Sequence, residues 1–238
     1  MEYKNWLKGI LVAAALASGV AHAGTVAPAL TGVVNITDGG SATWYLPSSY
    51  SPNGDGTYDY TGTVANPSLW NFVWDITVNP DPFIDATLTI TNNTSSTKHF
   101  DFLFTLPVGS PFASGLKSGS LSGSFKDLNN SGSVSLSNFD WHGLIDTNDA
   151  MSLISGTFGC GGAGCLGSIG TVSDGPLSSG PVNSTIGTHI VFDLSAGDQA
   201  SFTSHFEVVP TVVPIPGAVW LFGSGLLGLA GIARRKKF

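Results

Sequence analysis

The chain has 238 residues, of which only 11% are charged, and its formal net charge is −7. Low charge combined with 31 glycines and 11% aromatic residues is typical of an exported β-protein and excludes a disordered chain, which needs high charge and few aromatic residues. Six of the nine basic residues lie at the two ends, so the part between them carries three basic and fifteen acidic residues. Such an acidic body is a poor partner for nucleic acid, whose phosphates require Lys and Arg.

The N-terminus has the three parts of a secretory signal peptide. Two lysines are followed by an apolar stretch over residues 9–20, which is too short to cross a bilayer, and then by the cleavage triplet Ala21-His22-Ala23. We therefore expect residues 1–23 to be removed by signal peptidase, with the cut between Ala23 and Gly24.

The loop from Ser51 to Asp59 is a candidate calcium site. Asn53, Asp55 and Asp59 offer side-chain oxygens at spaced positions, and the glycines between them allow a sharp turn. The loop lacks a terminal bidentate Glu, and Asn-Gly and Asp-Gly are also common in hairpins, so a plain turn is the favoured interpretation. A weaker calcium candidate comprises residues 127–132. Residues 146–149 would supply ligands only if the fold brings them close to another site. We expect no other cofactor.

Apolar and polar residues alternate with a period of two through the body, as in Phe100, Phe102 and Phe104 with Asp101 between them. This alternation predicts antiparallel strands with one face in a core and one in water. Turn residues separate the runs. We expect residues 24–209 to form an all-β domain of roughly ten strands, a β-sandwich of jelly-roll type, with a barrel as the alternative. The alternating runs are 70–78, 84–90, 100–106, 190–194 and 202–208.

One run changes phase along its length. Val134 and Leu136 alternate in one register, whereas Phe139 and Trp141 alternate in the other. An extra residue in the strand would bring all four side chains to the same face. The sequence therefore predicts a β-bulge near Asn138.

The two cysteines, Cys160 and Cys165, enclose a four-residue Gly-rich segment. In an exported protein this pattern predicts a disulfide. The loop it closes is short, so the bridge is expected to fix the shape of the loop.

The sequence contains no metalloprotease, nucleophile-elbow or phosphate-loop motif, and we expect no enzymatic activity. The body histidines are scattered singly and are interpreted as strand-face residues. A glycosidase would need paired carboxylates, and no spacing marks such a pair. The body histidines are His99, His142, His189 and His205.

Aromatic residues before the first strong strand offer a second interpretation. Trp44, Tyr45, Tyr58 and Tyr60 would form a platform for sugars if exposed, or would pack in the core or at an edge. The threonines of residues 87–91 are interpreted as an ordinary solvent face rather than an ice-binding surface.

The C-terminal segment 210–238 ends in an uncharged apolar stretch, 215–233, which is long enough to cross a bilayer as a helix. Trp220 lies near the outer end of this stretch. The basic cluster Arg234, Arg235, Lys236 and Lys237 follows at once and is expected to remain in the cytoplasm. A plain membrane anchor is one interpretation of this tail.

The motif Val213-Pro214-Ile215-Pro216, the glycine-punctuated helix and the basic end together resemble the PEP-CTERM sorting signal of Gram-negative bacteria. Ile215 stands where Glu is usual, so the tail is similar to the VPLPA-type variant. The resemblance implies recognition by a membrane-embedded exosortase, which is thought to cut at the motif, and an association with exopolysaccharide or biofilm.

These features predict an exported, non-enzymatic surface or extracellular-matrix protein. Its partners would be signal peptidase, an exosortase and the inner membrane before processing, and then exopolysaccharide. The alternatives are a polysaccharide-binding module, with or without calcium, and a secreted hydrolase.

Overall fold

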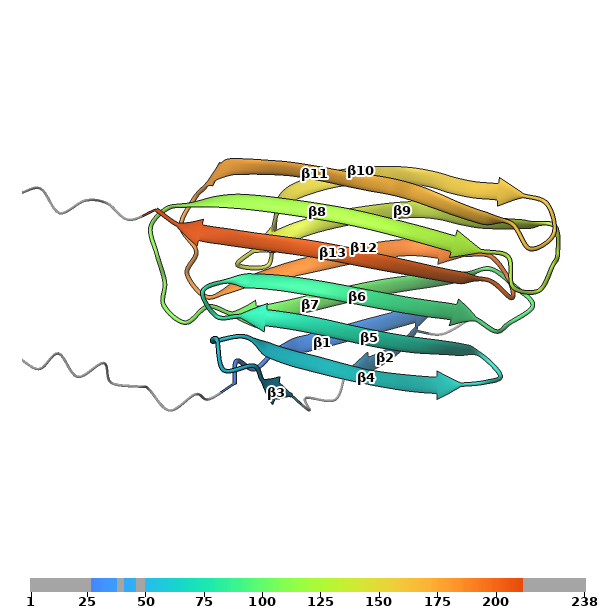
Figure 1. Ribbon diagram of the computed structural model, residues 1–238, viewed down its shortest axis with the longest axis horizontal. Helices are drawn as coiled ribbons and strands as arrows, with labels where there is room; N and C mark the ends of the chain where they lie inside the picture. The colour runs from blue at the N-terminus through green and yellow to red at the C-terminus, as the bar shows by residue number, and fades with distance from the viewer. Residues whose placement is uncertain (1–26, 38–40, 46–49, 212–238) are drawn as a thin grey trace, which may run out of the picture.

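The structure is a computed structural model that describes residues 27–37, 41–45 and 50–211. These residues form two antiparallel sheets that lie face to face (Figure 1), so the prediction of an all-β sandwich is confirmed. No helix occurs among them, and hence none with the length and hydropathy to cross a membrane.

Sheet A has six strands. In spatial order they are β10 (Asn148–Gly161), β9 (Ser133–Ile145), β12 (Thr185–Leu194), β7 (Lys98–Pro107), β1 (Thr31–Thr37) and β2 (Ser41–Tyr45). Sheet B has seven strands. Their spatial order is β11 (Leu166–Ser179), β8 (Gly115–Lys126), β13 (Gln199–Pro210), β6 (Phe83–Asn92), β5 (Trp70–Asn79), β4 (Tyr58–Asn66) and β3 (Ser51–Pro52).

Eight of these strands pair as nested hairpins. β9 pairs with β10, β8 with β11, β7 with β12 and β6 with β13, and every pair is antiparallel. The chain crosses from one sheet to the other after β2, β6, β7, β8, β10, β11 and β12. The remaining strands extend the two sheets, with β5, β4 and β3 beyond β6 and with β1 and β2 beyond β7.

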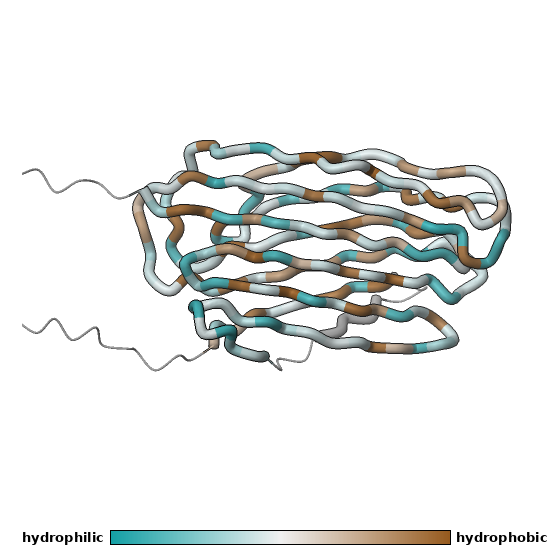
Figure 2. Tube along the Cα trace, in the orientation of Figure 1, coloured by the Kyte–Doolittle hydropathy of each residue, from teal (hydrophilic) through white to brown (hydrophobic). Residues whose placement is uncertain are grey.

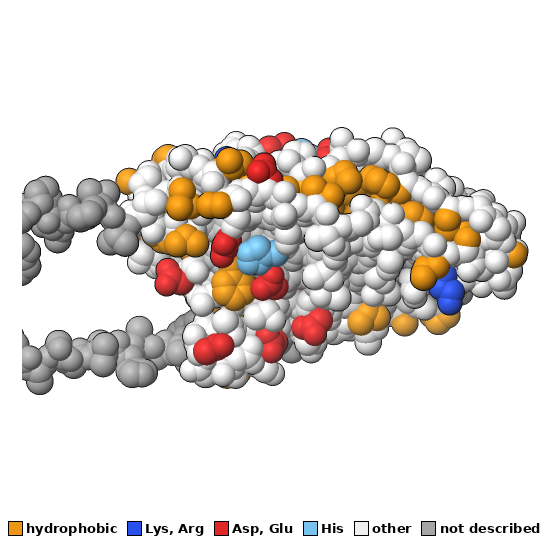
Figure 3. All heavy atoms as spheres, turned by 45° about the horizontal axis from the view of Figure 1, so that its top comes forward, with side chains coloured by type: hydrophobic (Ala, Val, Ile, Leu, Met, Phe, Trp, Pro, Cys, Tyr) orange, Lys and Arg blue, Asp and Glu red, His pale blue; other side chains and the backbone are white. Residues whose placement is uncertain are grey.

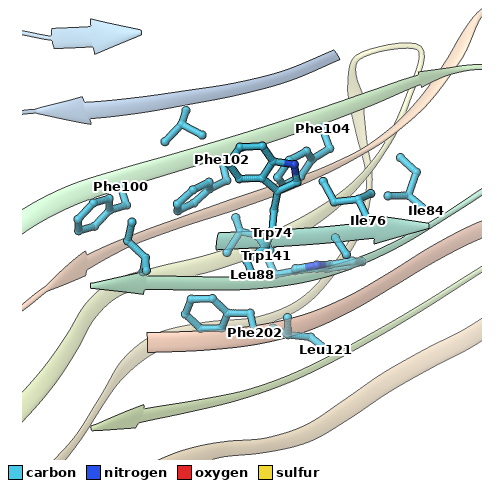
Figure 4. Packing of buried hydrophobic residues seen from close by; sticks show 14 of the residues in the cluster. Trp74, Ile76, Ile84, Leu88, Phe100, Phe102, Phe104, Leu121, Trp141 and Phe202 are labelled. Atoms are coloured by element: carbon cyan, nitrogen blue, oxygen red, sulfur yellow. The ribbon is translucent and has the colours of Figure 1, made fainter. Parts of the chain in front are cut away.

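The period-two pattern places the large apolar side chains between the sheets. On β7, Phe100, Phe102 and Phe104 are fully buried, whereas Asp101 faces outward. Figure 2 shows the resulting alternation of hydrophobic and hydrophilic residues along the strands, and Figure 4 shows side chains of both sheets meeting in the core. Burial of each such ring contributes about 1.5–3 kcal/mol relative to exposure. The largest fully buried side chains are Trp74, Trp141, Phe72, Phe100, Phe102, Phe104, Phe139, Phe192, Phe202 and Phe206.

The predicted bulge is confirmed. Along the β9–β12 ladder, Asp140 is opposite Val191 and Ser137 is opposite Asp193, so β9 has one residue more than its partner. Asn138 lies inside this interval with a positive φ of 51°. Val134, Leu136, Phe139 and Trp141 are consequently all buried.

The described residues form thirteen strands, more than the roughly ten expected. The additional elements include β8 and β11, which consist mainly of Ser and Gly with few large apolar residues. Several of their inward positions hold glycine, so the alternation of apolar and polar residues is weak in the sequence, although both strands are paired along their length.

Candidate functional site

Two rows of hydroxyl groups cross the outer face of sheet B. The ladders place a hydroxyl residue of β6 beside one of β13, then one of β8 and one of β11. Neighbouring strands lie about 4.8 Å apart and successive outward residues about 6.7 Å apart, so the hydroxyls of β6, β13 and β8 form a regular array, whereas β11 has one extra residue between the rows. The rows are Thr89, Ser201, Ser124 and Ser168, and Thr87, Thr203, Ser122 and Thr171.

A shallow groove of about 320 Å³ runs across these rows, lined by Thr203 and the surrounding hydroxyls and glycines. Its lining contains no charged side chain. Hydroxyl groups both donate and accept hydrogen bonds, so the groove suits a neutral ligand that also carries many hydroxyls.

At the end of sheet B nearest the described termini, an imidazole lies among carboxylates. His205 Nδ1 is 2.6 Å from Asp85 Oδ1, and His205 Nε2 is 3.8 Å from Glu207 Oε2. The Ser118 hydroxyl donates to Glu207 Oε1 at 2.6 Å, and the Phe83 ring lies beside the imidazole with centroids 6.2 Å apart. Figure 3 shows carboxylates gathered around an imidazole on this face. The Ser118 hydroxyl bonds a carboxylate and not the imidazole, so this group does not form a nucleophile–base pair.

The electrostatics of this group favour a charged imidazole. The hydrogen bond to Asp85 raises the pKa of His205, and the charges of Asp85 and Glu207 add to the rise. Partial burial opposes it without cancelling it.

The other three histidines lie on the outer face of sheet A, and each meets an aspartate. His189 Nε2 is 2.9 Å from Asp101 Oδ1, and His99 Nδ1 is 2.6 Å from Asp193 Oδ1. His142 Nε2 is 2.9 Å from Asp140 Oδ2, and its ring is 6.3 Å from that of His189. The interpretation of the histidines as strand-face residues is confirmed, but the aspartate partners were missed. The partner depends on strand register, which the sequence alone does not give.

A larger hollow of about 530 Å³ lies at the same end of the sandwich as the described termini. It is bordered by the turn 79–82, the segment 109–112, Tyr58 and Pro210. Prolines and aromatic rings make up much of its wall.

The three calcium candidates of the 51–59 loop have protein partners. Asn53 Nδ2 donates to Thr57 Oγ1 at 3.0 Å, and Asp55 Oδ1 accepts from the Thr57 hydroxyl at 2.6 Å and from its amide at 2.9 Å. These bonds lower the pKa of Asp55. Asp59 accepts from the Thr77 hydroxyl at 2.7 Å, on the neighbouring strand. The geometry favours the plain-turn interpretation of this loop.

In the part of the chain that the structure describes, three or more His, Cys, Asp or Glu side chains nowhere converge as a metal cage. A hard cation would therefore need amide, hydroxyl or carbonyl oxygens to complete its coordination.

Two other acidic residues singled out by the sequence hold loops together. Asp146 accepts from the amides of Asn183, Ser184 and Thr185, and these donors lower its pKa despite the opposing effect of desolvation. Asp127 accepts from amides of its own loop and from Gly164 of the disulfide loop. The Cys160–Cys165 disulfide itself is confirmed.

The aromatic platform is wrong for Tyr58 and Tyr60. Both are core residues, with exposed fractions of 5% and 3%, and they pack beside the exposed ring of Tyr50. Trp44 and Tyr45 belong to β2, the edge strand of sheet A.

Several predicted sites lie outside the described residues. They are the signal cleavage site at Ala23 and Gly24, the sorting motif Val213 to Pro216, the apolar stretch 215–233, and the basic end Arg234 to Lys237. No protein-family model matches the chain, and no curated protein matches it.

Proposed function

We propose that this chain is an exported, non-enzymatic protein of the cell surface or extracellular matrix. The observation that carries the proposal is the closed Cys160–Cys165 disulfide in a body with no free cysteine among the described residues. Such bridges persist in oxidising, extracytoplasmic compartments. The signal-peptide pattern of residues 1–23 points to the same compartment.

The sorting route follows from the resemblance of the tail. Signal peptidase removes residues 1–23, and the helix 215–233 inserts in the inner membrane of a Gram-negative cell with Arg234 to Lys237 on the cytoplasmic side. An exosortase then recognises the motif at 213–216. The sandwich reaches the cell surface or the extracellular matrix, where exopolysaccharide is its neighbour.

The pairing of the imidazoles supports a non-catalytic role. His99, His142, His189 and His205 each bond an aspartate on a flat sheet face rather than a serine hydroxyl in a cleft. A strand-face imidazole held in this way stabilises neighbouring strands through cross-strand pairing.

The test is the intact mass and C-terminal peptide map of the native protein, taken separately from membranes and from medium. We expect a chain that begins at Gly24 and ends within 214–216. A native chain that retains residues 217–238 in both fractions would make the tail a permanent anchor and overturn the exosortase step.

Polysaccharide binding is the second candidate function, favoured by the uncharged hydroxyl groove over sheet B. We infer that β6 to β13 form a jelly roll, because their nested pairing and division between two sheets match that topology. Lectins are among the proteins that use this architecture, which is support by analogy alone.

A pull-down on extracted exopolysaccharide tests this second function. Thr203 is exposed and lines the groove, so Thr203→Trp should block a chain lying across the hydroxyl rows and reduce the bound fraction. Ser152→Trp places the same bulk on an exposed position of β10 and should leave binding unchanged. Equal binding by both variants would exclude the groove, and repetition with EDTA would reveal any cation requirement.

A further inference from the structure

Two buried carboxylates face each other at the disulfide end of sheet B. Gln199 is opposite Lys126 and Ala200 is opposite Phe125 in the β13–β8 ladder, which places Asp198 opposite Asp127 one step beyond the paired residues. Asp198 and Asp127 continue the inward phase of Ala200 and Phe125, and their exposed fractions are 0% and 1%. Side chains directly opposite on adjacent antiparallel strands have Cβ atoms about 5 Å apart.

One oxygen of the pair has no hydrogen-bond partner in the described residues. Asp198 Oδ2 accepts a hydrogen bond from the Ser195 hydroxyl, but Asp198 Oδ1 is buried and has no hydrogen-bond partner. Like charges directly opposite on a ladder destabilise it, and an unpaired buried charge is costly. The arrangement therefore needs either a cation or a proton between the two carboxylates.

The electrostatics agree with close approach of the two groups. Burial raises the pKa of Asp198 and the charge of Asp127 adds to the rise, while the bond from Ser195 opposes it. Burial would also raise the pKa of Asp127, but the amides of Gly132, Gly164 and Ser131 outweigh it and the pKa is lowered.

The loop that follows Asp127 has the oxygen spacing of a calcium loop. Its residues, Asp127-Leu128-Asn129-Asn130-Ser131-Gly132, place oxygen-bearing side chains at positions one, three and five and glycine at position six. Asp127 Oδ1 accepts from the Ser131 amide at 3.1 Å, and Asp127 Oδ2 accepts from the Gly132 amide at 3.0 Å. Gly132 has a φ of 101°, which gives the sharp turn at position six.

We propose that a divalent hard cation, calcium by its ligand chemistry, binds between Asp127 and Asp198, with further oxygens from Asn129 and Ser131. Two carboxylates, an amide oxygen and a hydroxyl are the ligands that calcium prefers, and carbonyls or water complete its shell. The site does not depend on polysaccharide binding or on the sorting route. It also reverses the ranking from the sequence, in which the 51–59 loop was the stronger calcium candidate.

Three loops meet at this site, which gives the cation a structural role. Asp127 Oδ2 accepts from the Gly164 amide at 3.1 Å, within the disulfide loop. Asn129 Nδ2 donates to the Ala196 carbonyl at 2.7 Å, within the turn between β12 and β13. A bound cation would therefore fix the β8–β9 loop, the disulfide loop and the β12–β13 turn together.

Calorimetric titration of the full-length chain with CaCl2, after removal of metal with EDTA, tests the proposal. We expect saturable binding with a Kd of about 0.1–1 mM, the range of extracellular calcium modules. At a tenfold excess of calcium over the Kd, the Tm should rise by about 3 °C. MgCl2 should produce a smaller rise, because magnesium loses its water shell reluctantly.

Asp198→Asn keeps the shape of the side chain and removes its charge, so calcium binding and the calcium-induced rise in Tm should be lost. Ser131→Ala keeps the amide that Asp127 binds and should weaken calcium binding about tenfold by removing one oxygen ligand. Asp55→Asn in the other candidate loop is the matched control and should bind calcium as the unsubstituted chain does.

Unchanged binding in Asp198→Asn would overturn the proposal, as would binding that is lost in Asp55→Asn instead. A chain that does not bind calcium would overturn the proposal as well. If the Tm of that chain also falls as the pH rises through the raised pKa of Asp198, the two carboxylates share a proton in place of the cation.

Discussion

The Asp146 side chain ties the β9–β10 turn to the start of β12. Its two oxygens accept from the amide and side chain of Asn183, the amide and hydroxyl of Ser184 and the amide of Thr185. A carboxylate that accepts several such bonds is strongly favoured in its charged form. The sequence suggests Asp146 as a metal ligand, whereas its hydrogen bonds show that it connects the β9–β10 turn to the residues at the start of β12.

Asp146→Asn should lower the free energy of unfolding at pH 7 by about 1 kcal/mol, a value reduced for solvent screening of this partly exposed group. The pKa of Asp146 is lowered by folding, so its contribution is full above the unfolded pKa of about 4 and fades as the pH falls below it. Urea unfolding at several pH values measures the difference, which should shrink in acid. Asp149→Asn, on the same hairpin, is the control, and a difference that stays constant with pH would contradict the assignment.

The imidazole of His205 should titrate above the ordinary value of about 6.5, because Asp85 and Glu207 favour its charged form. Its stabilising contribution is therefore full below that ordinary value and is lost as the pH rises through the raised pKa. An NMR titration of the ring protons measures the midpoint. Asp85→Asn should move the midpoint down, whereas Asp75→Asn should leave it unchanged, and an identical midpoint in Asp85→Asn would refute the pairing.

At the scale of elements, β9 depends on one residue with unusual backbone geometry. Asn138 has a φ of 51°, and its Nδ2 donates to Asp193 Oδ2 at 2.6 Å on the neighbouring strand. Asn tolerates the left-handed region, whereas β-branched residues do not. The bulge therefore corrects the phase of β9 and also supports the His99–Asp193 pair.

Asn138→Val should lower the free energy of unfolding by about 1–2 kcal/mol, because a branched residue cannot adopt the positive φ without strain. Asn138→Gly removes the bond to Asp193 but relieves the backbone, so its loss should be smaller. Chemical denaturation of the two variants measures which of them loses more free energy of unfolding. Equal stability of Asn138→Val and the unsubstituted chain would show that the bulge can move to another residue.

The strands that can be predicted from the sequence are those whose inward-facing residues are large. The runs on β5, β6 and β7 alternate Trp, Phe, Ile and Leu with polar residues, so their strand character and inward face follow directly. β8 and β11 interrupt their inward apolar residues with glycines, so the period-two pattern is weak, and their places in the sheet follow from the pairing of β8 with β13 and of β11 with β8. The Asp127–Asp198 pair was missed for the same reason, since 71 residues separate its members and only the β8–β13 register brings them together.

At the scale of the whole molecule, the two sheets are joined by packing and by a buried hydrogen bond between them. Trp141 of β9 donates its indole N–H to the hydroxyl of Ser204 of β13 at 2.7 Å, and both residues are fully buried. The indole ring also contacts Phe206 edge-on. A buried donor that loses its acceptor bears its full desolvation cost.

Ser204→Ala should lower the free energy of unfolding by about 1–3 kcal/mol, because it leaves the indole N–H of Trp141 unpaired. In the Trp141→Phe background the same substitution should cost less, since no donor remains to be satisfied. A double-mutant cycle by thermal denaturation measures the coupling. Additive losses in the cycle would show that the hydrogen bond between Trp141 and Ser204 makes no contribution of its own to the free energy of unfolding.

Both ends of the described chain, near residues 27 and 211, lie at one end of the sandwich, and the disulfide loop lies at the other (Figure 1). β10 alone has 14 residues, so at about 3.3 Å per residue the body is roughly 46 Å long. If the chain is connected to a support through residue 211, this end of the body lies nearest the support. The disulfide end is then the part of the body farthest from the support. Cleavage of such a connection after residue 211 would release both sheets and the disulfide end together.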